Sequence, residues 1–219
     1  MVGILHTRAM PPSSPSPLQT AIRRELHFFS LYRVLEGALL CLTVFSPVGV
    51  FLGGEPRHPV LAAVVAAAYL LGACLLFFTR KGGHVRPMVL LGIGLDITAS
   101  LLAMHALPSA AAGIAMMLLF NVGAAAMLLP QRWSLVIAAL AGGALLGEHL
   151  WTLLAGHGRD RPLAEMLMFS VSYLAIATLT SIVGRQMRAS QALAEERGSQ
   201  VANMAEVNEL IIRRMRTGV

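Results

Sequence analysis

Long apolar stretches follow one another from Leu31 to Gly184, separated by short segments rich in Gly, Pro or Arg. The hydrocarbon core of a bilayer is about 30 Å thick, and a helix needs roughly 20 apolar residues to cross it. Backbone amides in hydrocarbon must bond within their own segment, so each stretch is predicted to be a helix. The six predicted spans are Leu31–Gly53, Val60–Thr79, Met88–Leu107, Gly113–Leu129, Trp133–Leu154 and Met166–Gly184.

The fold class that follows is an all-α membrane protein: six transmembrane helices in a domain over residues 25–184, followed by a cytoplasmic helix. Composition agrees, because 56% of the residues are hydrophobic and only 13% are charged, against roughly 25% charged in a soluble domain. The net charge of +6 could suggest nucleic-acid binding. Most basic residues flank the spans, however, so a lipid bilayer is the expected partner and nucleic acid is not.

The distribution of Lys and Arg predicts the orientation of the chain. A Pro- and Ser-rich arm over residues 1–24 is expected to be disordered and cytoplasmic. One side of the predicted topology holds Arg8, Arg23, Arg24, Arg80, Lys81, Arg86, Arg132, Arg185 and Arg188. The opposite side holds only Arg57, Arg159 and Arg161. Because cytoplasmic loops are enriched in basic residues, both termini are predicted to be cytoplasmic.

Polar residues inside the spans are candidates for intramembrane sensing, because they are costly in hydrocarbon. Asp96 lies near the middle of the third span and Asn121 near the middle of the fourth. Helical rise places them roughly 16 Å and 12 Å from the outer end that the two helices share. An antiparallel hairpin would bring them together, either as a switchable contact or as static contact between helices.

A second polar layer is expected nearer the outer face, where His105, Glu148, His149 and Tyr173 fall. These residues fit a proton pathway or a ligand-facing rim, or else interfacial anchoring. Glu148 lies beside Gly143 and Gly147, whose spacing favours close helix approach.

Arg33 and Glu36 lie three residues apart near the start of the first span. This spacing puts them on one helix face, and a local ion pair is the simplest interpretation. No GxxxxGK[ST], HExxH, CxxC or GxSxG motif occurs in the sequence. No catalytic residue or metal ligand is therefore predicted within the chain.

The charged tail from Arg185 to Thr217 predicts a helix of about 50 Å. Its apolar residues recur with alternating steps of three and four, as in a coiled-coil seam. The predicted dimer seam consists of Val201, Met204, Asn208, Ile211 and Met215. A buried Asn208 would specify the register of a homodimer. Because no proline occurs from Leu163 onward, the tail is predicted to continue the sixth span without a break.

The tail sequence ALAEERGSQVANMAEVNELIIRRMRTGV ends at Val219, and it resembles the segment joining membrane and cytoplasmic parts in the PilS sensor histidine kinases of type IV pilus regulation. The string RELHFFSLYRVLEGALL, which begins at Arg24, is similar to the start of their first span. Asp96 and the GEH string ending at His149 fall where that family carries intramembrane polar groups. The string NELIIRRMRTGV is the most specific part. The 107–113 connection is poorer in glycine than expected for the family.

The resemblance implies the input domain of a two-component sensor kinase in the bacterial inner membrane. Such a domain would detect the transmembrane helix of the major pilin and adjust pilin expression through a response regulator. A PAS domain and a kinase that uses ATP and Mg would follow Val219, so no cofactor is expected in this chain and its own enzymatic activity stays open. Two other classes remain: a small proton-coupled transporter using Asp96, Glu148 and His149, and a structural membrane scaffold.

Overall fold

The computed structural model describes residues 17–47, 56–79, 85–156 and 162–217, and these ranges are helical apart from short connections. A short 3-10 turn, η1 (Pro108–Ala110), joins the two helices that flank it. The helices are α1 (Pro17–Phe45), α3 (Pro59–Thr79), α4 (Val85–Ala106), α5 (Ala111–Leu128), α6 (Gln131–Leu154) and α7 (Leu163–Thr217). In the described part of the chain, six helices are long and apolar enough to cross a membrane. The predicted all-α membrane fold with six spans is confirmed.

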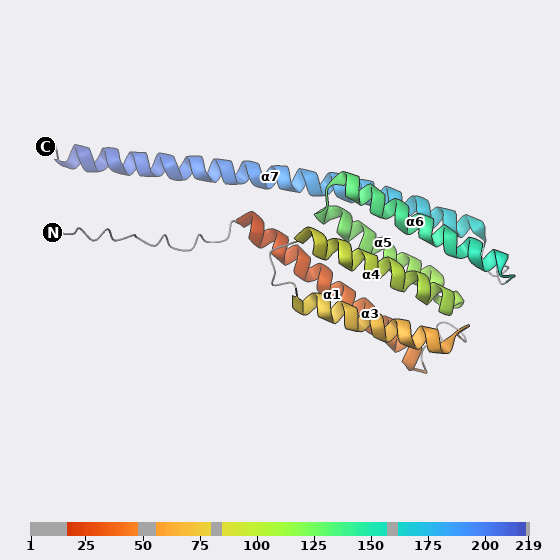
Figure 1. Cartoon of the computed structure of the whole chain (residues 1–219). Coiled ribbons are helices and arrows are strands. Elements are labelled where there is room, and N and C mark those ends of the chain that lie inside the picture. Colours follow the sequence, from red (N-terminus) through yellow and green to blue (C-terminus); the bar gives the residue numbers. More distant parts are fainter. Residues whose placement is uncertain (1–16, 48–55, 80–84, 157–161, 218–219) are drawn as a thin grey trace, which may run out of the picture.

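The helices form one bundle in which neighbours in sequence pack side by side (Figure 1). α1 packs on α3, α3 on α4, and α4 on α5, while α5 and α6 both pack on α7. α1 also meets α5, but along a much shorter stretch. α1 begins and α7 leaves the bundle at the same end, as an even number of crossings requires (Figure 1).

The first helix differs from the prediction at both ends. Residues 17–24 are already helical, so the expectation of a disordered arm is wrong for this part. The proline at position 17 occupies the first helical position, where its missing N–H is not needed and its fixed φ suits a helix. α1 ends at Phe45, two residues before Pro47, since proline disfavours helical backbone in the residue before it. Residues 1–16 of the arm and 48–55, with the predicted end of the span, lie outside the described residues.

α7 is the longest element, with 55 residues in one unbroken helix. Its length is about 80 Å at the usual helical rise, and it extends far beyond the other helices (Figure 1). Gly198 lies inside it without interrupting the helical backbone. The predicted continuity between the sixth span and the tail is confirmed.

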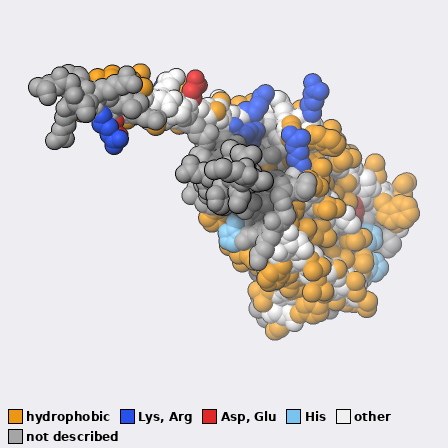
Figure 2. Space-filling model, turned by 60° about the vertical axis from the view of Figure 1, so that its left-hand side comes forward, with side chains coloured by type: hydrophobic (Ala, Val, Ile, Leu, Met, Phe, Trp, Pro, Cys, Tyr) orange, Lys and Arg blue, Asp and Glu red, His pale blue; other side chains and the backbone are white. Residues whose placement is uncertain are grey.

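The interior of the bundle is built largely from small side chains. Ala66, Ala115, Ala125, Ala138 and Ala141 are fully buried, and such residues let helix backbones approach closely in membranes. Large apolar side chains instead cover much of the outer surface, where orange predominates on the visible face of the bundle (Figure 2). A surface of this kind is matched to hydrocarbon.

Candidate functional site

A bidentate ion pair between α1 and α4 lies inside the bundle. Arg33 donates from Nε to Asp96 Oδ1 at 2.7 Å and from Nη2 to Oδ2 at 2.6 Å. The side chains are 3% and 0% exposed. The Phe29 ring adds a cation–π contact, with its centroid 4.4 Å from Arg33 Cζ. A bidentate pair of this kind joins two charge-assisted hydrogen bonds, which are among the strong ones in proteins.

Three further polar groups extend the ion pair to α3 and α5. The Tyr69 hydroxyl lies 2.9 Å from Glu36 Oε2 and 3.0 Å from Asp96 Oδ1. Asn121 donates from Nδ2 to Glu36 Oε2 at 2.6 Å. We refer to Arg33, Glu36, Tyr69, Asp96 and Asn121 as the buried polar network. It joins four helices through side chains that are all buried.

Local sequence explains why these side chains point inward. Arg33 and Glu36 share one face of α1 at a separation of three residues, whereas Leu31 and Leu35 are exposed on its outer side. Gly92 of α4 makes room for the guanidinium, because a Cβ there would collide with Arg33. The neighbouring helices therefore provide a bonding partner for each of the two ionisable side chains of α1.

The network holds one cation and two carboxyl groups. The Tyr69 hydroxyl lies within hydrogen-bond distance of two carboxyl oxygens. Because a hydroxyl has one O–H hydrogen, it can donate to only one of them. An uncompensated charge is costly inside a membrane, and one additional proton would balance the network. Asn121 Oδ1 is buried and has no hydrogen-bond partner among the residues that the structure describes. No group of His, Cys, Asp or Glu suited to a metal ion was found among the described residues.

The structure places Asp96 and Asn121 away from lipid, since both are fully buried. The expectation that each faces another helix is confirmed. Their contact is indirect, however, because Glu36 and Tyr69 stand between them. Three members of the network, Arg33, Glu36 and Tyr69, are not among the sensing candidates that the sequence predicted. Glu36 was interpreted as a local partner of Arg33, which is wrong because Arg33 instead bonds across helices to Asp96.

The outer polar layer is only partly a unit. His105 Nδ1 lies 3.3 Å from Glu148 Oε1. The ring of His58 stacks on the ring of His105, with 5.6 Å between the ring centroids. Tyr173 instead donates to the Ala115 carbonyl of α5 at 2.9 Å. His149 is buried at 3% exposure, and in the described part of the chain its side chain forms no hydrogen bond with the other three residues. His58 was not foreseen, because it precedes the second span and reaches α4 only through the fold.

The close approach of α6 to α7 occurs one residue from the predicted position. A Cβ on Gly142 would lie 3.1 Å from Ser170 Cβ, and the Ser170 hydroxyl donates to the Gly142 carbonyl at 3.1 Å. Gly143 and Gly147 have open space where a Cβ would be. The interpretation of that pair as a packing motif is therefore wrong, since both face away from a neighbouring helix.

α7 is tied to α5 where it leaves the bundle. Arg188 Nη1 donates to the Met127 carbonyl at 2.7 Å, and a Cβ on Gly184 would lie 2.9 Å from the same oxygen. Beyond this point the tail is exposed, including Val201, Met204, Asn208 and Ile211 of the predicted seam. The side chain of Met215 lies outside the described residues. These four exposed seam residues face no other part of the described chain, so they are available for pairing with a second copy.

The described geometry defines a class: a multi-pass α-helical membrane domain whose spans share a charged interior network and whose last span continues as a long exposed helix. A model of the PilS-like transmembrane domain matches residues 16–194, and the chain belongs to this family. It is 29% identical over 203 residues to the sensor protein kinase PilS of Pseudomonas aeruginosa, a match covering 90% of this chain. The chain spans 37% of the length of that relative. No solved structure matches.

Proposed function

We propose that this chain is the input domain of a two-component sensor histidine kinase, which responds to the transmembrane helix of the major pilin and so adjusts pilin expression. The observation that carries the proposal is α7, a single helix from the sixth span to Thr217. A rigid helix of this kind can transmit a rotation or a small axial shift out of the membrane. The similarity to a sensor protein kinase also supports the proposal of an input domain.

The contacts offer a route from the membrane helices to the tail. α1 is joined to α4 by Arg33–Asp96 and to α5 by Glu36–Asn121. α5 in turn is bonded to α7 through Tyr173 and Arg188. A partner helix that displaces α1 would strain the network, and α5 would pass the displacement to α7. Coupling through discrete bonded arrangements of this kind favours two distinct states over a gradual change.

The remaining parts of the proposal rest on the family resemblance and on charge. A parallel homodimer through the tail would align two kinase parts after Val219, which would use ATP and Mg to phosphorylate a response regulator. Arg86, Arg132, Arg185 and Arg188 flank the spans on one predicted side. The enrichment of basic residues in cytoplasmic loops supports an inner-membrane location with both termini in the cytoplasm.

The transporter alternative gains no support from the geometry. Asp96 is paired with Arg33, whereas Glu148 contacts His105. His105 lies about 13 Å from Asp96 along α4 by helical rise. His149 joins neither group. The described polar residues thus form two separate clusters and not one path.

The test introduces Asp96→Asn and Glu36→Gln separately into the intact kinase, in cells with and without the pilin gene. A pilin-promoter reporter measures output, and membrane-fraction blotting checks the amount of protein. Thr98→Val is the matched control, because Thr98 is exposed on α4 two residues from Asp96. We expect either network variant to change basal output several-fold and to reduce the response to pilin. If the output of the parent kinase does not change with pilin, pilin is not the stimulus. If the network variants behave like Thr98→Val, the buried polar network is not part of the switch.

A further inference from the structure

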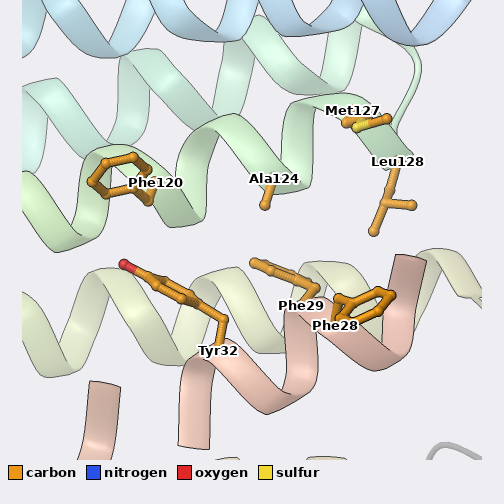
Figure 3. A pocket seen from close by; sticks show the side chains of 7 residues that line it. All are labelled: Phe28, Phe29, Tyr32, Phe120, Ala124, Met127 and Leu128. Atoms are coloured by element: carbon orange, nitrogen blue, oxygen red, sulfur yellow. The ribbon is translucent and has the colours of Figure 1, made fainter. Parts of the chain in front are cut away.

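An apolar groove lies between α1 and α5 on the half of the bundle from which the tail leaves. Phe28, Phe29 and Tyr32 of α1 face Phe120, Ala124 and Leu128 of α5 across it (Figure 3). At one end the rings of Tyr32 and Phe120 approach to 6.3 Å edge-to-face, which closes the groove beside the buried polar network. At the other end, Phe28 and Leu128 flank the opening (Figure 3).

The size of the groove selects among possible occupants. Its volume is about 360 Å³, and a helix about 10 Å wide with a 5.4 Å pitch fills about 420 Å³ per turn. The groove therefore cannot enclose one turn of a partner helix, which could only lie over its mouth and insert side chains. A cavity of about 150 Å³ in another protein holds one benzene ring, so this groove has room for roughly a dozen or more carbons. The matching occupant in a bilayer is one hydrocarbon chain.

A positive charge marks the open end. Met127 lines the groove, and its carbonyl accepts a hydrogen bond from Arg188 of α7. This bond uses one of the five N–H donors of the guanidinium, and no carboxylate among the described residues pairs with Arg188 in a salt bridge. The blue side chains of the bundle gather near the end where the tail leaves (Figure 2). An apolar groove with an arginine bonded to the backbone of one of its lining residues is complementary to a lipid with an anionic headgroup.

We propose that the groove binds one acyl chain of an anionic phospholipid, whose phosphate is held by Arg188. The lipid would join α1, α5 and α7, the three helices between which a signal has to pass. The proposal does not depend on pilin detection, because lipid binding by the chain itself decides it.

Lipid retention by the purified 219-residue chain provides the test. Native mass spectrometry during stepwise delipidation compares palmitoyl-oleoyl phosphatidylglycerol with palmitoyl-oleoyl phosphatidylcholine. We expect one tightly held phosphatidylglycerol. Ala124→Trp, which fills the groove, should lower its retention at least tenfold, whereas Leu140→Trp on the exposed face of α6 should not. Ala124→Leu replaces the Trp variant if circular dichroism shows lost helix.

The headgroup contact is tested separately. Arg188→Gln should lower the preference for phosphatidylglycerol about fivefold, the factor that one basic residue near an anionic surface contributes. Arg197→Gln, the same charge change about 13 Å further along α7, should leave it unchanged. Equal retention of both lipids in the parent chain overturns the proposal. Unaltered phosphatidylglycerol retention in the Ala124 variants also overturns it. If those variants instead lose crosslinking to a pilin helix, the groove binds side chains of that partner helix and not a lipid.

Discussion

Alanine at position 92 tests whether the Arg33–Asp96 pair stabilises the folded bundle. Gly92 and Gly94 lie two residues apart, and both are interior positions of α4. A Cβ on Gly92 would collide with the guanidinium of Arg33, whereas a Cβ on Gly94 would meet no atom within 4 Å. The two substitutions therefore change helix propensity equally but affect the ion pair differently.

The expected magnitudes follow from these contacts. Replacing glycine by alanine in a helix interior contributes about 1 kcal/mol of stability, so Gly94→Ala should raise the free energy of unfolding by about that amount. Gly92→Ala gains the same term, but Arg33 must leave Asp96. Removing one partner from a buried ion pair costs about 3–5 kcal/mol. Gly92→Ala should therefore lower the free energy of unfolding by about 2–4 kcal/mol, the difference between those two terms.

The assay is unfolding of the purified chain by SDS in mixed micelles, followed by circular dichroism. A second measurement repeats Gly92→Ala in an Arg33→Ala/Asp96→Ala background, where the alanine methyl no longer meets a guanidinium. The penalty should disappear in that background. Equal effects of Gly92→Ala and Gly94→Ala, or a penalty that persists without the ion pair, would show that the pair is not what Gly92 accommodates.

Three other outcomes are expected. Glu36→Gln should change the free energy of unfolding by less than about 1 kcal/mol, because a neutral amide can still bond Tyr69 and Asn121. Glu36→Ala should lower it by about 2–3 kcal/mol, because buried polar groups lose their partner. Equal losses for the two variants in the SDS assay would contradict the network. Single cysteines in residues 80–87 should resist a membrane-impermeant thiol reagent in cells, and cysteines in residues 156–161 should react; the opposite pattern would reverse the topology. Pairwise disulfide crosslinking along residues 201–215 should peak at the seam positions, and Asn208→Leu should alter the oligomeric state; a flat profile would exclude a coiled coil.

The sequence by itself determined the features that depend on local chemistry. Apolar length predicted six spans, because hydrocarbon thickness and backbone hydrogen bonding leave one solution for such segments. The absence of proline after Pro162 predicted the continuity of α7, since nothing in the sequence interrupts its backbone bonds. The burial of Asp96 and Asn121 followed from the cost of exposing either group to lipid.

Only the tertiary structure decided which polar groups are partners. Spacing along α1 suggested that Arg33 would pair with Glu36, yet Arg33 bonds to Asp96 and Glu36 to groups on α3 and α5. Tyr69 lies in a uniformly apolar stretch, so no pattern of polar residues in the sequence indicated that its hydroxyl has a partner. The physical reason is that sequence spacing constrains neighbours within one helix, whereas contacts between helices depend on rotation and depth, which are set by close packing of small residues such as Gly92 across the whole bundle.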